Sequence, residues 1–193
     1  MKKLLFLFTA VLSISLSANP LVGSKFGSDS VQCVTNISLY REYVKQKNYD
    51  DAMTPWRKAY ELCPKASKNI YIDGAKLYKH LISKNKGAVE LQKAYLDSLE
   101  TLYDNRIANF GKENYVLGLK GSDMMKYSFS DLDRAFTYLK QSVEGQQVKS
   151  KATALFSYFK AATEKYKAKS FDKAQVLEVY AVVADYLDVN ITK

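Results

Sequence analysis

The sequence predicts an all-α fold built as a solenoid of about four helical hairpins. Strand signals are almost absent from Cys33 onward, and only Pro55 and Pro64 interrupt this helix-forming region. Apolar residues there recur at three- and four-residue steps, the spacing of one helix face. One such stripe consists of Leu132, Ala135, Phe136, Leu139 and Val143. A single hairpin would leave these stripes in water, so stacking of successive hairpins is expected to bury them.

Turn and capping signals divide this region into pairs of helices. The expected pairs are 34–47 with 50–63, 66–84 with 88–109, 113–127 with 131–144, and 148–168 with 171–188. Asp50, Ser130 and Ser170 are expected N-caps, because short polar side chains accept hydrogen bonds from the free N–H groups of a first turn.

The N-terminus has the pattern of a secretory signal. Met1-Lys2-Lys3 precedes an apolar run from Leu4 to Leu16 that ends among small residues, which predicts a signal peptide over residues 1–18. The alternative is an N-terminal membrane helix, although the run is short for a bilayer. A flexible leader is expected over 19–32 and the folded domain over 33–190. The protein is therefore expected to be exported, to the periplasm or cell envelope, with no transmembrane segment after signal cleavage.

The chain is basic, with a formal net charge of +9 that falls to about +7 without Lys2 and Lys3. Such a charge would suit a nucleic acid, but export makes that partner unexpected. In an envelope compartment, an acidic protein surface, an anionic lipid or a glycan would suit it instead. A solvated, lysine-rich helical surface without a specific partner is the other interpretation.

Two cysteines, Cys33 and Cys63, occupy the ends of the first predicted hairpin that should lie side by side. In an oxidising compartment this placement predicts a disulfide. Closing a loop of this size would stabilise the fold by about 3 kcal/mol on the chain-entropy argument. The alternative is two separately buried thiols.

Catalytic and metal-binding motifs are not found in the sequence. His80 is the single histidine, and no serine, cysteine or carboxylate stands at a recognisable motif spacing from it. One histidine and two cysteines also fall short of a zinc-site pattern. We therefore expect a protein that is not an enzyme, with no catalytic residue, no metal and no cofactor.

The first hairpin carries a family resemblance. Its residues at the consensus spacing are Leu39, Tyr43, Ala52, Trp56, Ala59 and Pro64. This stretch resembles one tetratricopeptide (TPR) unit, and the later hairpins resemble more degenerate units. Several short runs, among them Pro55-Trp56-Arg57 and Tyr115-Val-Leu-Gly118, are also similar to uncharacterised secreted TPR proteins of Bacteroidetes.

The resemblance implies a binding surface. In TPR proteins the first helix of each unit lines a concave face, which here points to Arg41 and Lys45 in the first unit and Lys68, Tyr71 and Lys79 in the second. The implied function is non-enzymatic: a scaffold of the bacterial envelope that binds a segment of a protein partner. The alternative is a structural envelope protein that binds anionic lipid or glycan through lysine-rich helix faces.

Overall fold

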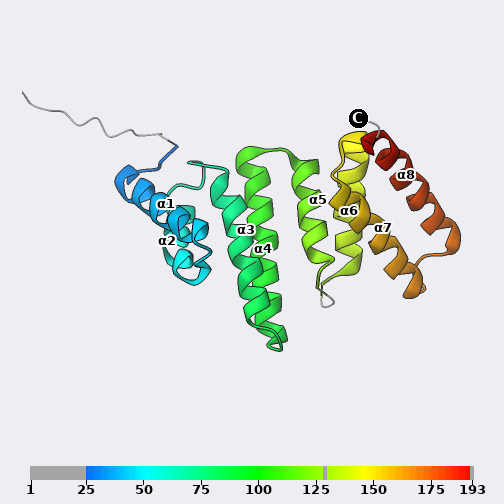
Figure 1. Ribbon diagram of the computed structural model, residues 1–193, viewed down its shortest axis with the longest axis horizontal. Coiled ribbons are helices and arrows are strands. Elements are labelled where there is room, and N and C mark those ends of the chain that lie inside the picture. The colour runs from blue at the N-terminus through cyan, green and yellow to red at the C-terminus, as the bar shows by residue number, and fades with distance from the viewer. Residues whose placement is uncertain (1–24, 128–129, 192–193) are drawn as a thin grey trace, which may run out of the picture.

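A computed structural model describes residues 25–127 and 130–191, and this part of the chain contains helices and no strands (Figure 1). The predicted all-α class is thus confirmed. The expected signal peptide, 1–18, lies outside the described residues, as does 19–24 of the expected leader. Within the described ranges, no helix combines the length and the apolar character needed to cross a bilayer.

Consecutive helices pair along the chain. The elements are α1 (Ser30–Lys45), α2 (Tyr49–Leu62), α3 (Asn69–Lys84), α4 (Val89–Phe110), α5 (Glu113–Met124), α6 (Leu132–Gln146), the 3₁₀ turn η1 (Gln147–Lys149), α7 (Ala152–Lys167) and α8 (Lys173–Ile191). Packing is densest within the pairs α1 with α2, α3 with α4, and α5 with α6, whereas α7 packs to a similar extent on α6 and on α8. Figure 1 shows these hairpins following one another in a row from the blue end to the red end. Each predicted helix range is occupied by a helix in the described part of the chain, and α1 begins at Ser30, ahead of the expected start.

Three observed N-caps lie within two residues of the expected ones. The observed caps are Asn48, Asp131 and Asp172, in place of Asp50, Ser130 and Ser170. The two serine hydroxyls instead donate to carbonyls before the turn, from Ser130 to Met124 O at 2.8 Å and from Ser170 to Lys165 O at 3.0 Å. These serines therefore close the preceding helix, and the neighbouring aspartates start the next one.

A disulfide joins Cys33 on α1 to Cys63 at the end of α2, with the two Cα atoms 6.0 Å apart. Both cysteines are buried. The predicted bridge is confirmed, and the alternative of two separate thiols is wrong. The disulfide holds together the open end of the first hairpin.

Trp56 joins the first hairpin to the second. Its side chain is fully buried on α2, and its Nε1 donates to the backbone oxygen of Ile70 at 2.7 Å. The indole fits because Gly74 has no Cβ: one built there would lie 2.3 Å from Cζ2 of the ring. Residues of α1 through α6 share this hydrophobic core.

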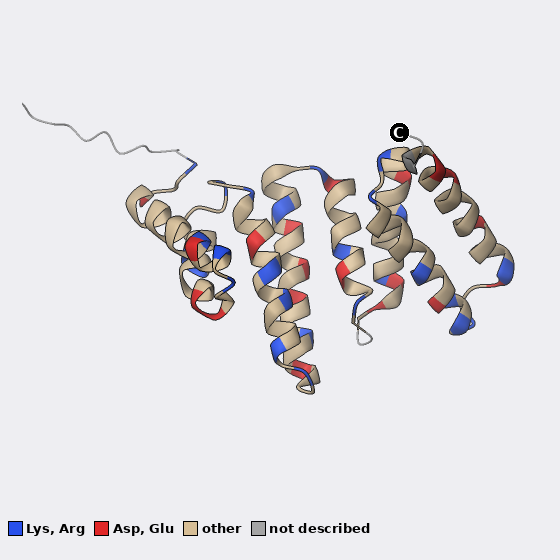
Figure 2. Cartoon of the chain, viewed as in Figure 1, with Lys and Arg blue, Asp and Glu red and all other residues tan. Residues whose placement is uncertain are grey.

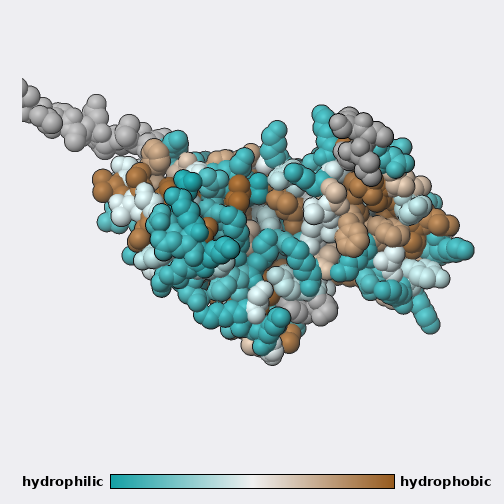
Figure 3. All heavy atoms as spheres, in the orientation of Figure 1, coloured by the Kyte–Doolittle hydropathy of each residue, from teal (hydrophilic) through white to brown (hydrophobic). Residues whose placement is uncertain are grey.

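A second hydrophobic cluster holds the C-terminal hairpin against α6, through residues such as Leu139, Leu155 and Val183. Apolar side chains also remain on the surface of this hairpin: Phe156, Leu177 and Tyr180 are each more than half exposed. Hydrophobic residues accordingly gather over α7 and α8 in Figure 3, whereas hydrophilic atoms dominate the middle of the same face.

Candidate binding groove

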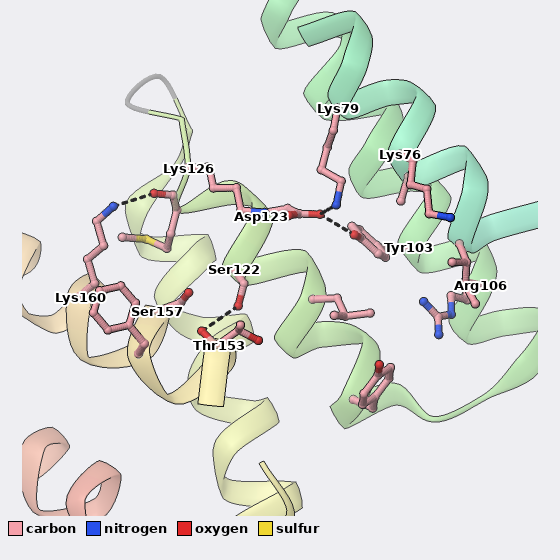
Figure 4. Close-up of a pocket in the computed structure, with 16 residues that line it drawn as sticks. Lys76, Lys79, Tyr103, Arg106, Ser122, Asp123, Lys126, Thr153, Ser157 and Lys160 are labelled. Carbon is pink, nitrogen blue, oxygen red and sulfur yellow. Dashed lines mark hydrogen bonds and ion pairs between the residues drawn. The ribbon is translucent and has the colours of Figure 1, made fainter. Parts of the chain in front are cut away.

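Three adjoining pockets form one groove along α3, α5 and α7. The central pocket has a volume of about 570 Å³ and is bounded by all three helices and by α4 (Figure 4). A second pocket of about 460 Å³ shares Ile72, Arg106 and Tyr115 with it. A third, of about 360 Å³, shares Met125, Lys126 and Lys160. Because the pockets share walls, they form one continuous depression, the groove.

The groove is basic, although both signs of charge alternate over the molecule as a whole (Figure 2). The carboxylates that line it are Asp123 and Glu164. The cations that line it are Lys68, Lys76, Lys79, Arg106, Lys112, Lys126 and Lys160. The excess of positive charge is therefore concentrated along this concave surface, where walls of low dielectric constant strengthen its field.

Asp123 is the centre of a polar network in the groove wall. Its carboxylate accepts a hydrogen bond from the Tyr103 hydroxyl at 2.6 Å and lies 3.0 Å from Lys79 Nζ (Figure 4). Lys126 forms a further ion pair with it. Burial raises the pKa of Asp123, but the charge of Lys79 and the hydrogen bonds from Lys126 and Tyr103 outweigh this effect, so the pKa lies below the usual carboxyl value. The ionised carboxylate thus links α3, α4 and α5.

Arg106 on α4 is the buried cation of the groove, with 6% of its surface exposed. In Figure 4 its guanidinium points into the pocket. No ion pair or side-chain hydrogen bond is formed by this guanidinium with any described residue, and its neighbour is the Tyr115 ring, whose centroid lies 5.7 Å from Cζ. Burial lowers the pKa of the Arg106 side chain.

Apolar side chains complete the walls. Phe156 on α7 keeps 67% of its surface exposed beside the central pocket, and Leu119 and Ile72 lie on the α5 and α3 sides. Lys160, also on α7, donates to the Met125 carbonyl at 3.2 Å and so reaches the C-terminal end of α5 (Figure 4). An occupant of the groove would therefore meet both positive charge and apolar surface.

Lys68 and Lys79, two of the five residues predicted to bind a partner, line the groove. Arg41 and Lys45 are exposed on α1 but are not among its lining residues, and Lys45 lies 3.5 Å from Glu42. Arg41 and Lys45 therefore do not share a surface with Lys68 and Lys79 in the groove.

The prediction for Tyr71 is corrected by its burial. Its side chain is fully buried, its hydroxyl accepts a hydrogen bond from Asn109 Nδ2 at 2.7 Å, and its ring packs between Tyr60 and Phe110. Position 71 faces α4, whereas the groove face of α3 follows Ile72, Lys76 and Lys79 at helical spacing. Tyr71 is thus a core residue and offers no surface to a partner.

Several lining residues were not anticipated from the sequence. Lys126, Phe156 and Lys160 would have followed from applying the first-helix rule to the third and fourth hairpins, since they lie on or beside α5 and α7. Arg106 would not, because it belongs to the second helix of its hairpin and no sequence motif surrounds it.

His80 lies at the edge of the fold. Its Nε2 is 3.3 Å from Asp50 Oδ1, whose other oxygen accepts a hydrogen bond from Lys84 at 2.8 Å. No nucleophile accompanies this pair among its described hydrogen-bond partners. The described residues also contain no group of three or more His, Cys, Asp or Glu side chains able to hold a metal ion.

Comparison of the chain with protein-family models, with curated proteins and with solved structures finds no match.

Proposed function

We propose that this protein is a TPR-like, non-enzymatic scaffold that binds an acidic segment of a protein partner along the groove. The observation that carries the proposal is the combination of concave shape, excess Lys and Arg, and apolar walls over α3, α5 and α7. Complementary charge would speed encounter and set the partner's position, and apolar contacts would supply affinity.

The arrangement of the helices supports the TPR-like part of the proposal. Three of the helices that line the groove, α3, α5 and α7, are each the first helix of a hairpin, and the groove crosses three consecutive hairpins. Repetition of one supersecondary unit along the chain gives such extended concave surfaces in solenoid proteins.

The disulfide supports export to the periplasm or cell envelope. Disulfides such as Cys33–Cys63 form and persist in oxidising compartments and are rare where thiols are kept reduced. Together with the signal-like pattern of residues 1–18, this favours an exported scaffold.

A protein segment suits the groove better than a membrane or glycan surface. The cations lie in a depression with aromatic and aliphatic walls, and not on a flat external face. A flat anionic surface could reach the exposed lysines of the rim but not Tyr115 or Leu119, which are only partly exposed. Binding to an anionic lipid surface is therefore one of the outcomes of the test.

The test measures binding of a fluorescein-labelled, acetylated and amidated peptide in which glutamates are spaced between leucines and serines. The affected variant is Lys68→Glu/Lys160→Glu, which reverses charge at the two ends of the groove. The matched control is Lys58→Glu/Lys86→Glu, which makes the same change in net charge at exposed positions outside it. A parallel titration uses vesicles of equal parts phosphatidylglycerol and phosphatidylcholine.

We expect the wild type and the control variant to bind the peptide alike and the groove variant to bind at least tenfold more weakly. Added salt should weaken the wild-type complex, because it screens these charges. Equal loss in both variants would overturn the proposal, and so would vesicle binding without peptide binding.

A further inference from the structure

We infer that Arg106 is the anion-binding centre of the groove, where it receives one side-chain carboxylate of the bound acidic segment through two parallel N–H···O bonds. This inference rests on the proposed function and names the group that the groove selects. It starts from the burial of Arg106 and from the direction of its guanidinium.

A buried arginine is normally paired, because removing its charge from water is costly without a compensating anion. Arg106 is 6% exposed, and no described carboxylate forms an ion pair with it. The exposed part of its guanidinium faces the groove (Figure 4). An anion that enters the groove would therefore supply the partner that the fold does not.

Lys120 on α5 shows how the same hairpins treat a buried cation that has a structural role. It is 2% exposed, like Arg106 close to fully buried, but its Nζ lies 2.7 Å from Asp104 and 3.8 Å from Glu100. The two buried cations differ in their partners: Lys120 is neutralised within the fold, and Arg106 is not.

The neighbouring lysines do not provide the same site. Lys79 and Lys126 are both bound to Asp123, and Lys76 lies 2.7 Å from Asp73. The charges of these three lysines are therefore partly neutralised by carboxylates of the fold. Arg106 retains its full set of side-chain donors for a ligand.

The chemistry of the guanidinium points to a planar anion. Its fork of N–H groups matches the two oxygens of a carboxylate, which an ammonium group does not. The Tyr115 ring beside it can restrict its plane, and Ile72, shared by the two pockets that Arg106 lines, excludes water from one side. Partial desolvation strengthens such a charge-assisted bond.

The experiment is a double-mutant cycle between Arg106 and each glutamate of the peptide used above. Each glutamate is changed in turn to glutamine, and every peptide is titrated into the wild type, Arg106→Gln and Arg106→Lys. We expect one glutamate whose replacement weakens wild-type binding at least tenfold but leaves binding to Arg106→Gln unchanged. Arg106→Lys should keep the charge and lose most of this coupling, because it lacks the planar fork.

Urea unfolding of the free proteins separates a ligand-binding role from a structural one. Removal of an unpaired buried charge should leave the midpoint of Arg106→Gln equal to or above that of the wild type. Lys120→Gln, which removes a paired charge, should lower the midpoint. A marked loss of stability in Arg106→Gln would overturn the inference.

The binding results also distinguish the two proposals. Suppose that the wild type binds the peptide, that Lys68→Glu/Lys160→Glu binds it at least tenfold more weakly, and that no glutamate couples to Arg106. The Arg106 site is then wrong and the groove proposal stands. If the wild type binds no acidic peptide, both are wrong.

Discussion

The indole of Trp56 on α2 lies directly against the backbone of Gly74 on α3, so the first hairpin contacts the groove-forming helix without an intervening side chain. A hydrogen bond from Trp56 Nε1 to the Ile70 carbonyl fixes the ring at this contact. The disulfide-bonded hairpin is thereby joined to the helix that carries Lys76 and Lys79. The contact positions one wall of the groove.

Gly74→Ala should therefore destabilise the protein by about 1–3 kcal/mol, the usual cost of inserting a methyl group into a packed core. The new Cβ would lie 2.3 Å from the indole, so either the ring or α3 must move. The measurement is the free energy of urea unfolding. The control is Ser83→Ala, at an exposed position of the same helix, which should change it by less than about 0.5 kcal/mol. Equal stability of Gly74→Ala and wild type would contradict this packing.

Reduction of Cys33–Cys63 should lower the free energy of unfolding by about 3 kcal/mol, because the unfolded chain regains the freedom that the bridge removes. Urea unfolding with and without dithiothreitol measures the change. The double variant Cys33→Ser/Cys63→Ser serves as the control, since reductant should not affect it. A wild type that responds to reductant no more than this variant would show that the bridge is absent or contributes nothing.

Acid should remove the contribution of Asp123 to stability. Its pKa is lower in the folded protein than the usual carboxyl value, so its stabilising effect is complete above about pH 4 and is lost as the pH falls through the folded-state pKa. Asp123→Asn should be less stable than wild type at neutral pH, and the difference should shrink toward about pH 2. Urea midpoints across this range provide the test.

Asp97→Asn, an exposed position on α4, is the matched control for that series and should follow the wild-type curve. A stability difference between wild type and Asp123→Asn that stays constant with pH would show that the carboxylate charge is not the source of the effect.

Removing the Tyr103 hydroxyl, which donates a hydrogen bond to Asp123, should lower stability by less than Asp123→Asn does at neutral pH. Tyr103→Phe leaves the ring in place and removes one hydrogen bond to an ionised group, worth about 1.5–3 kcal/mol. Because Tyr103 lines the groove without offering positive charge, peptide affinity should change by less than the effect of Lys68→Glu/Lys160→Glu. Unfolding and peptide titration of the same preparation check both statements.

The hairpins could be predicted because their signals are local. Helix periodicity is visible within each segment, and turns such as Asn85-Lys86-Gly87 are marked by residues next to the helix ends. The disulfide followed from the same hairpin geometry. N-caps were displaced by one or two residues because adjacent polar residues compete: Asp131 takes the cap and Ser130 the preceding carbonyls.

The site was less predictable because it depends on how each helix is rotated against its neighbours. Tyr71 and Ile72 are adjacent in the sequence, yet one is buried against α4 and the other lines the groove. Arg106 reaches the groove from a second helix, through the space between α3 and α5. The burial of Tyr71 and the position of Arg106 both depend on packing between hairpins. The residue pattern of a single helix does not predict that packing.

The most direct test of the groove is NMR mapping of the bound peptide on the isotope-labelled protein. Titration with the glutamate–leucine peptide should shift amide resonances along α3, α5 and α7, centred on Ile72, Leu119 and Phe156. The exposed positions Lys58 and Lys86 should remain unchanged. Shifts confined to the outer, apolar side of α8, or no shifts at a saturating peptide concentration, would contradict binding in the groove.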